Sequence, residues 1–203
     1  MNLAPLNYNF GNASNYSFAT TITCNNEDAR KMFVEGFGHM LNYNHEQAIA
    51  CYMNVTELDP TCAMAWWGIA YCVSSNYNWT PGLGSGYDPI QQAISLKAGC
   101  SALEQDLIDA LAQRHSEEAR DAADPSVLNM GNSPELNIAF AKAMAPLYLK
   151  YKGNLDVAAI YVEALMNLNA WQLWSKNTET GEITPLDNNT LLCVKVMEDA
   201  FEN

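Results

Sequence analysis

The sequence predicts an all-α domain of antiparallel helix pairs, and three observations support this. The chain of 203 residues is 49% hydrophobic, which is enough for one sizeable core. Strand patterns are weak, and a first helix pair within residues 29–62 is indicated by residues at the required spacing: Ala29, Gly36, Ala48, Tyr52 and Pro60. Two antiparallel helices approach closely only where one presents a small side chain, and an aromatic ring one turn later fills the adjoining gap. A proline then stops the second helix.

A second helix pair follows at a fixed distance. Trp66 stands 34 residues after Met32, at a position where the repeat favours tryptophan, and it is followed by Ile69 and Ala70 at repeat positions 7 and 8. This recurrence predicts a helix over residues 61–74.

The partner of that helix is displaced along the chain. Residues 74–88 are rich in Pro, Gly, Ser and Asn, which cannot continue a helix, and they predict a loop insertion. The partner helix is then expected at about residues 89–97. Farther on, residues 180–186 could form a short hairpin, but the weak pattern favours a loop.

A third, degenerate pair is indicated near the C-terminus. Gly153, Asp156 and Ala158 reproduce the turn and the small contact of the first pair. Pro146 and Ala170 stand where the pattern of the helix pair has glycine and proline, so this unit departs from that pattern.

These spacings resemble the tetratricopeptide repeat (TPR), a helical repeat of 34 residues. Two strings, NHEQAIACYM from residue 44 and DPTCAMAWWGIA from residue 59, are similar to a family of large TPR proteins, as is VEALMNLNAWQLW from residue 162. The resemblance covers about residues 26–200. It implies an α-solenoid that binds partners rather than catalyses, with an extended arm over residues 1–25 and a degenerate TPR domain over residues 26–203. Family members continue into a histidine-rich segment where Asn203 stands here.

The charge of the chain limits the choice of partners. Its 23 acidic and 10 basic side chains give a net charge of −13. Such a surface repels phosphate backbones and anionic lipid, so we expect no nucleic-acid partner. No run of 18 apolar residues occurs, so no membrane span is predicted.

Cysteine and asparagine patterns bear on the compartment. No C-x-x-C pair occurs, which argues against zinc and redox motifs, and Cys51, Cys62 and Cys72 are interpreted as small core residues. Asn-x-Ser/Thr sequons favour a secreted protein. They stand at Asn12, Asn15, Asn54, Asn78 and Asn188. Asn78 and Asn188 lie in predicted loops and are the expected glycosylation sites.

One cluster is a candidate metal site. Glu35 and His39 are four residues apart on one predicted helix, with His45 just past the turn. This spacing could hold a metal, but on a repeat helix it more commonly forms a surface hydrogen bond, so no metal or other cofactor is predicted. The chain has no G-x-S-x-G motif, phosphate-binding loop or paired nucleophile and base, so no enzymatic activity is expected.

A concave groove is the expected binding surface of such a repeat domain. The repeat register assigns seven residues to it: Arg30, Phe33, Phe37, Met40, Met64, Trp67 and Tyr71. An aromatic and methionine-rich groove suits an apolar segment of a partner. The same residues would also fit a core covered by the third helix pair.

The first 22 residues are rich in asparagine and aromatic residues and have no helical period. We expect them to dock on this groove or on a neighbouring subunit. The predicted anchors are Tyr8, Phe10, Tyr16 and Phe18. The sequence therefore favours a non-catalytic protein-interaction or assembly subunit, with a small-ligand or metal-binding TPR protein as the alternative.

Overall fold

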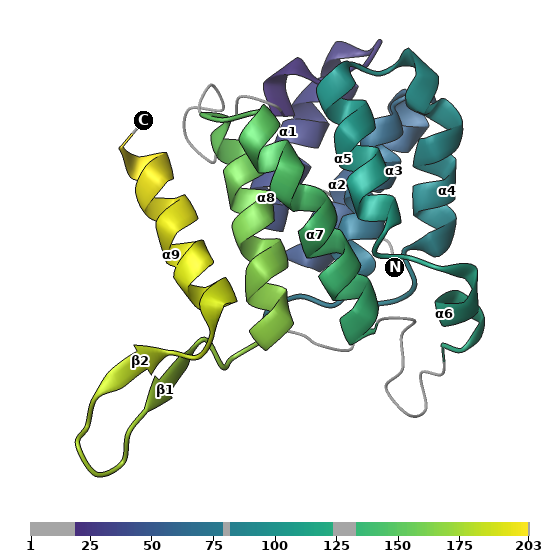
Figure 1. Ribbon diagram of the computed structural model, residues 1–203. Helices are drawn as coiled ribbons and strands as arrows, with labels where there is room; N and C mark the ends of the chain where they lie inside the picture. Colours follow the sequence, from purple (N-terminus) through teal and green to yellow (C-terminus); the bar gives the residue numbers. More distant parts are fainter. Residues whose placement is uncertain (1–18, 79–81, 124–132, 203) are drawn as a thin grey trace.

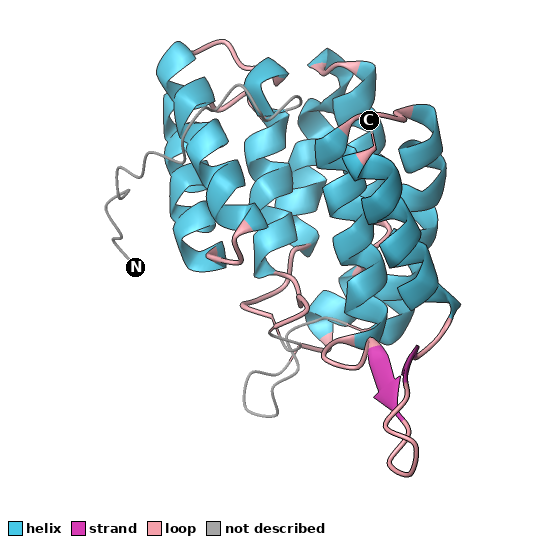
Figure 2. Ribbon diagram, turned by 90° about the vertical axis from the view of Figure 1, so that its left-hand side faces the viewer, coloured by secondary structure: helices cyan, strands magenta, loops and turns pink. Residues whose placement is uncertain are grey.

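The computed structural model describes residues 19–78, 82–123 and 133–202, and this part of the chain is mostly helical (Figures 1 and 2). The α-helices are α1 (Glu27–Leu41), α2 (His45–Leu58), α3 (Ala63–Val73), α4 (Tyr87–Leu96), α5 (Ala102–Ala112), α6 (Glu117–Asp121), α7 (Pro134–Lys150), α8 (Leu155–Met166) and α9 (Asn188–Phe201). Short 3₁₀ turns are η2 (Ala19–Thr21), η3 (Lys97–Gly99) and η5 (Asn167–Asn169). The expectation of an all-α domain agrees broadly with this mostly helical architecture, which also contains a small two-stranded sheet.

Helix α1 begins where the sequence supplies a cap. The side-chain oxygen of Asn26 accepts hydrogen bonds from the backbone N–H groups of Asp28 and Ala29, at 2.9 and 3.1 Å. The cap satisfies two of the otherwise unpaired donors of the first turn. Helix α2 follows after a three-residue turn in which Tyr43 adopts φ 60°.

The loop insertion predicted at residues 74–88 is present between α3 and α4, although α4 begins at Tyr87, slightly before its expected start. The carbonyl of Val73 accepts the backbone N–H groups of Leu83 and Gly84, at 2.8 and 3.0 Å. These bonds close the loop back on the end of α3. Gly82 supplies the positive φ of 73° that this return requires.

Helices α7 and α8 form the third predicted pair and lie side by side in Figure 1. Gly153 lies in the turn between them with φ 88°, a backbone conformation that favours glycine. Pro146 lies inside α7 rather than ending it. Helix α9 packs on the outer side of α8.

The interpretation of residues 180–186 as a loop is wrong, because part of this segment forms a hairpin. Strand β1 (Trp174–Lys176) pairs antiparallel with β2 (Ile183–Pro185). The turn forms locally: Asn177 Oδ1 accepts the N–H groups of Glu179 and Thr180, and Gly181 has φ 74°. The hairpin projects from the helical body (Figure 1).

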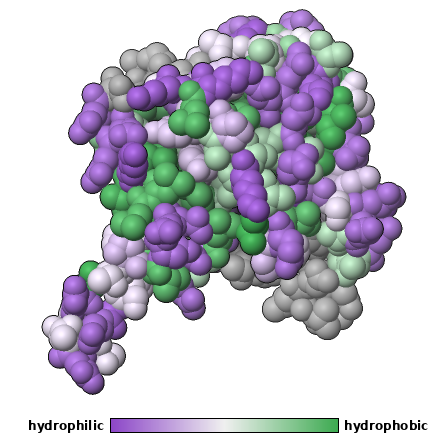
Figure 3. Space-filling view, viewed as in Figure 1, coloured by the Kyte–Doolittle hydropathy of each residue, from purple (hydrophilic) through white to green (hydrophobic). Residues whose placement is uncertain are grey.

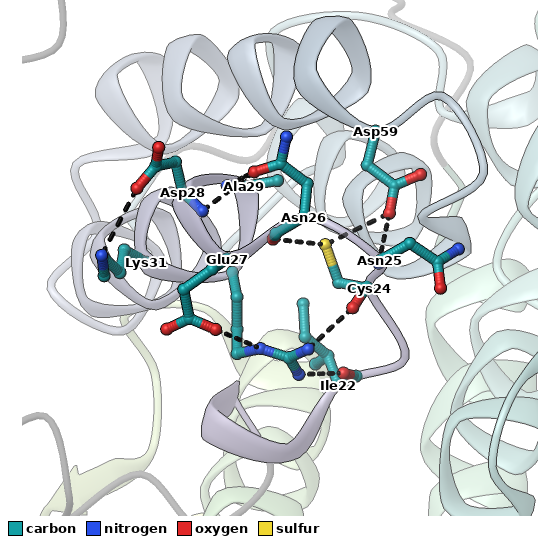
Figure 4. A network of polar contacts seen from close by, with 10 residues as sticks. Ile22, Cys24, Asn25, Asn26, Glu27, Asp28, Ala29, Lys31 and Asp59 are labelled. Atoms are coloured by element: carbon teal, nitrogen blue, oxygen red, sulfur yellow. Dashed lines mark hydrogen bonds and ion pairs between the residues drawn. The ribbon is translucent and has the colours of Figure 1, made fainter.

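Polar contacts dock the segment that precedes α1 (Figure 4). The guanidinium of Arg30 donates to the carbonyls of Ile22 and Cys24, both at 2.7 Å. Asp59 Oδ2 accepts the backbone N–H of Asn25 at 2.6 Å and the thiol of Cys24 at 3.4 Å. These bonds tie the segment to the junction between α2 and α3.

One contiguous core joins α1 to α5 and α7 to α9, and α6 contributes no buried residue to it. On the surface, large apolar side chains are exposed at Leu155, Trp174, Ile183, Leu191 and Phe201. Figure 3 shows a hydrophobic area on the side of the molecule from which the hairpin projects. Among the described residues, no helix combines the length and apolar character that crossing a membrane would require.

Candidate binding pocket

A pocket with a cavity volume of about 580 Å³ lies at one end of the helical body. It is formed where the end of α3, the start of α7, η5 and the start of α9 meet. Its lining comprises Ser75, Asn76, Ser133, Pro134, Asn137, Ile138, Asn167, Leu168, Asn169, Ala170, Gln172 and Asn189. Among these described residues, none carries a formal charge, and carboxamides predominate.

Local folding signals fix one wall of the pocket. Ser133 caps α7 by accepting the N–H of Leu136 at 3.2 Å, and Pro134 follows in the first turn. Proline suits this position, because its missing N–H would have no helical partner and its φ is already helical. Asn137 then lies one turn into α7 and faces the cavity from this wall.

Asp187 organises the opposite wall. It caps α9 by accepting the N–H of Thr190 at 2.9 Å. Its other oxygen accepts the amides of Asn169 at 2.8 Å and Asn189 at 3.1 Å, which orients both side chains. The hydrogen bonds from Thr190 and Asn169 lower the pKa of Asp187, so the carboxylate stays charged at neutral pH.

Arg114 is almost fully buried and bonds two residues of the pocket lining. Its guanidinium donates to the carbonyl of Ser75 and to Asn137 Oδ1, the latter at 2.9 Å. It also lies over the ring of Phe140, 5.4 Å from the centroid. Because Ser75 and Asn137 both line the cavity, Arg114 holds the loop after α3 against α7.

Three further buried polar groups, those of Tyr71, Glu163 and His45, lie beside this arginine. The hydroxyl of Tyr71 donates to Glu163 Oε2, and burial followed by that carboxylate raises the pKa of Tyr71. Nδ1 of His45 lies 3.1 Å from the carbonyl oxygen of Cys72 and 3.3 Å from Nδ2 of Asn76. Desolvation lowers the pKa of His45, which favours the neutral ring.

Asn167 is the lining residue with unused hydrogen-bonding capacity. Its Oδ1 and Nδ2 are both buried, and within the described part of the chain neither has a hydrogen-bond partner. A buried carboxamide left in this state costs free energy that a bound group with one donor and one acceptor would recover. The site is therefore suited to a neutral hydrogen-bonding ligand.

A serine and a histidine meet close to the pocket, but their environment does not activate a nucleophile. Ser74 Oγ lies 3.4 Å from Nε2 of His115. The same hydroxyl donates to the carbonyl of Ala70 at 2.7 Å, so its proton is already engaged. Desolvation and Arg114 lower the pKa of His115 to about 3, which makes it a weak base.

The predicted groove residues require a correction. Phe33, Phe37, Met40, Met64, Trp67 and Tyr71 are all buried in the core. Of the two interpretations of this set, the packed core is the one observed: α5 contacts α3, and the ring of Tyr71 packs against Phe140 of α7. Arg30 is partly buried and holds the segment before α1.

The remaining predicted site residues are dispersed. The arm anchors Tyr8, Phe10, Tyr16 and Phe18 lie outside the described residues. The side chains of Asn78 and Asn188 are exposed, but the expected loop position of Asn188 is wrong, because Asn188 is the first residue of α9. Glu35 and His39 lie together as expected, but the third donor beside them is Cys51 rather than His45.

Sequence spacing could not identify the pocket, because its residues come from four separate segments. The string that begins at Val162 contains Asn167, Asn169 and Gln172, but nothing in it marks these amides as neighbours of Ser75 or Asn137. Comparison of the chain with protein-family models, curated proteins and solved structures finds no match.

Proposed function

We propose that this protein is a non-catalytic binding domain that holds a polypeptide segment of a partner, or of a neighbouring subunit, in the amide-lined pocket. The observation that carries the proposal is the carboxamide of Asn167, buried in the lining with neither heteroatom bonded in the described chain. A carboxamide offers the same donor and acceptor as a peptide group, so it pairs with the backbone of an extended segment.

The remaining lining fits this occupant. Ile138, Leu168 and Pro134 supply apolar surface for side chains of the segment, next to the amides that would bind its backbone. The cavity volume of about 580 Å³ is in the range of ligand pockets and accommodates a few residues. The absence of formal charge in the described lining favours an uncharged stretch over a terminal carboxylate or a phosphate.

We propose further that the scaffold is of TPR type. Support comes from the α1–α2 and α7–α8 pairs, which lie at the expected positions, and from Gly36, a small residue at the contact between α1 and α2. TPR domains are interaction modules, which agrees with a peptide-binding role. The binding surface proposed here is the pocket at one end of the helices and replaces the apolar groove expected from the sequence.

The proposal is tested by selecting peptides from a random phage-displayed library on the wild-type protein and measuring their affinity for two variants. Asn167→Ala removes the unpaired carboxamide without breaking a bond seen in the described chain, so the fold is retained and the affinity falls. Asn54→Ala is the matched control, since Asn54 lies on α2 and is not part of the lining. Equal affinity for all three proteins, or failure to select any peptide, contradicts the proposal.

A small neutral ligand is the second candidate, favoured by the cavity volume of about 580 Å³. Sugars and simple amides present donors and acceptors that match the same carboxamides. Screening such compounds by ligand-observed NMR against wild type and Asn167→Ala separates the two candidates. Compounds that bind only wild type, together with no selected peptide, would favour the small ligand.

A further inference from the structure

We propose that Glu35, His39 and Cys51 form a Zn²⁺ site that joins α1 to α2. One ligand atom of each residue lies within 4.8 Å of the other two. Glu35 and His39 are one turn apart on α1, and Cys51 faces them from α2. These residues do not line the pocket, so this inference is independent of the proposed function.

Close packing of the backbones brings the three donors together. Gly36 follows Glu35 on α1, and a Cβ atom placed on it would lie 3.0 Å from Cβ of Cys51. Only glycine leaves room for α2 at this point. The thiol is thereby held against the turn of α1 that carries both other donors.

The donor set matches zinc chemistry. Zinc takes imidazole nitrogen, thiolate sulfur and carboxylate oxygen at about 2.0–2.3 Å, which places ligand atoms about 3.3–3.7 Å apart in a tetrahedron. The separations here are no more than 4.8 Å, so small rotations of the side chains suffice. Magnesium and calcium prefer oxygen donors alone and fit this set poorly.

Charge balance also favours a divalent ion. A thiolate and a carboxylate together neutralise Zn²⁺, so the buried assembly carries no net charge. His39 and Cys51 are buried, and Glu35 is partly exposed, which gives the ion a path from the Glu35 side. Three protein ligands leave the fourth position for water.

A second observation concerns Glu35 itself. Its Oε1 atom is buried, and within the described residues no donor bonds to it. A buried carboxylate oxygen without a donor is unfavourable. A cation bound between Glu35, His39 and Cys51 would satisfy it.

The test starts from protein stripped with a chelator and then titrated with ZnCl₂. We expect one Zn²⁺ bound per chain by calorimetry and a higher melting temperature, since a ligand that binds only the folded state stabilises it. Co²⁺ used as a probe should give a thiolate charge-transfer band in the near ultraviolet. That band identifies sulfur ligation directly.

Variants assign the ligands. Cys51→Ala should abolish the cobalt band, whereas Cys72→Ala, which removes another fully buried thiol, should retain it. Glu35→Gln keeps the shape of a partly exposed side chain and should weaken Zn²⁺ binding at least tenfold, while Glu57→Gln on exposed surface should not. No binding by wild type, a band that persists in Cys51→Ala, or unchanged affinity in Glu35→Gln would overturn the proposal.

Discussion

Tyr52 and two glycines set how closely the first three helices pack. The ring of Tyr52, on α2, lies between Gly36 on α1 and Gly68 on α3 and is fully buried. A Cβ atom at Gly36 would lie 3.0 Å from Cε1 of the ring, and one at Gly68 would lie 2.5 Å from Cε2. The ring therefore has no free space on either side.

Gly68→Ala should destabilise the protein by about 1–3 kcal/mol, because the new methyl group overlaps a ring that Gly36 prevents from moving away. This loss exceeds the roughly 0.5–1 kcal/mol that alanine contributes over glycine inside a helix. Urea denaturation of both proteins measures the difference.

Gly99→Ala is the control for that measurement, since nothing lies within 4 Å of a Cβ placed there. Its free energy of unfolding should stay close to that of wild type. Equal stability of the Gly68→Ala variant and wild type would show that the ring of Tyr52 can be displaced.

The sequence predicted some of these residues and missed others for a clear reason. Gly36, Ala48 and Tyr52 were identified because their spacing follows the helix pair itself. Gly68 was not, because its role depends on its contact with the ring of Tyr52 and not on the spacing within the first helix pair. Glu35 and His39 were recognised as a pair because they share a helix, whereas Cys51, which was interpreted as a core residue, joins them only after α2 has packed.

At the scale of elements, Asp59 holds together three parts of the chain. One oxygen accepts from Asn25 before α1, and the other accepts the backbone N–H and hydroxyl of Thr61 before α3, at 3.0 and 2.6 Å. Desolvation raises the pKa of Asp59, but the hydrogen bonds from Thr61 and Asn25 outweigh it, and the net effect lowers the pKa.

This lowered pKa predicts how stability depends on pH. Because the pKa in the folded state lies below the unfolded value of about 3.9, the stabilisation is complete above that value and is lost as the pH falls through the folded pKa. Asp59→Asn should therefore be less stable than wild type by about 1–3 kcal/mol at neutral pH, with the difference shrinking towards about pH 3.

Denaturant unfolding at several pH values checks this prediction. Asp28→Asn serves as the control, because the side chain of Asp28 is 80% exposed and pairs only with Lys31 among the ion pairs of the described chain. A difference between Asp59→Asn and wild type that is constant with pH would mean that the charge of Asp59 contributes nothing.

Elements with a strong helical pattern were predicted well, and the hairpin was not. Helices α2, α3 and α8 follow the period of their small and apolar residues. Strands β1 and β2 are three residues each and mostly exposed, so they have no alternating apolar pattern to detect. Their pairing depends on the turn at Asn177 and Gly181, and such short exposed strands give only a weak sequence signal.

At the scale of the whole molecule, the buried polar groups next to the pocket connect helices α3 and α5 to helices α7 and α8. Tyr71 on α3 bonds Glu163 on α8, and Arg114 after α5 bonds the loop after α3 and Asn137 on α7. No periodic pattern marks these groups: Glu163 is a single charged residue within an apolar stretch, whereas Arg114 stands among the polar residues Gln113, His115 and Ser116. The pocket lining could not be predicted either, because its residues also follow no periodic pattern in the sequence.

Arg114→Met should therefore destabilise the protein strongly, by about 3–5 kcal/mol, even though methionine fills much of the same space. The substitution leaves the carbonyl of Ser75 and Oδ1 of Asn137 without this donor, and it removes the positive charge that faces Glu163. Removing one partner of a buried charged group lowers the free energy of unfolding by more than the intact interaction adds to it.

Arg120→Met is the matched control, because the ion pairs of Arg120 with Asp88, Glu117 and Asp121 lie at the surface, where such pairs contribute little to stability. Thermal and urea unfolding should thus show a large loss of stability for Arg114→Met and near wild-type stability for Arg120→Met. Similar losses of stability in both variants would mean that Arg114 does not connect α3 and α5 to α7.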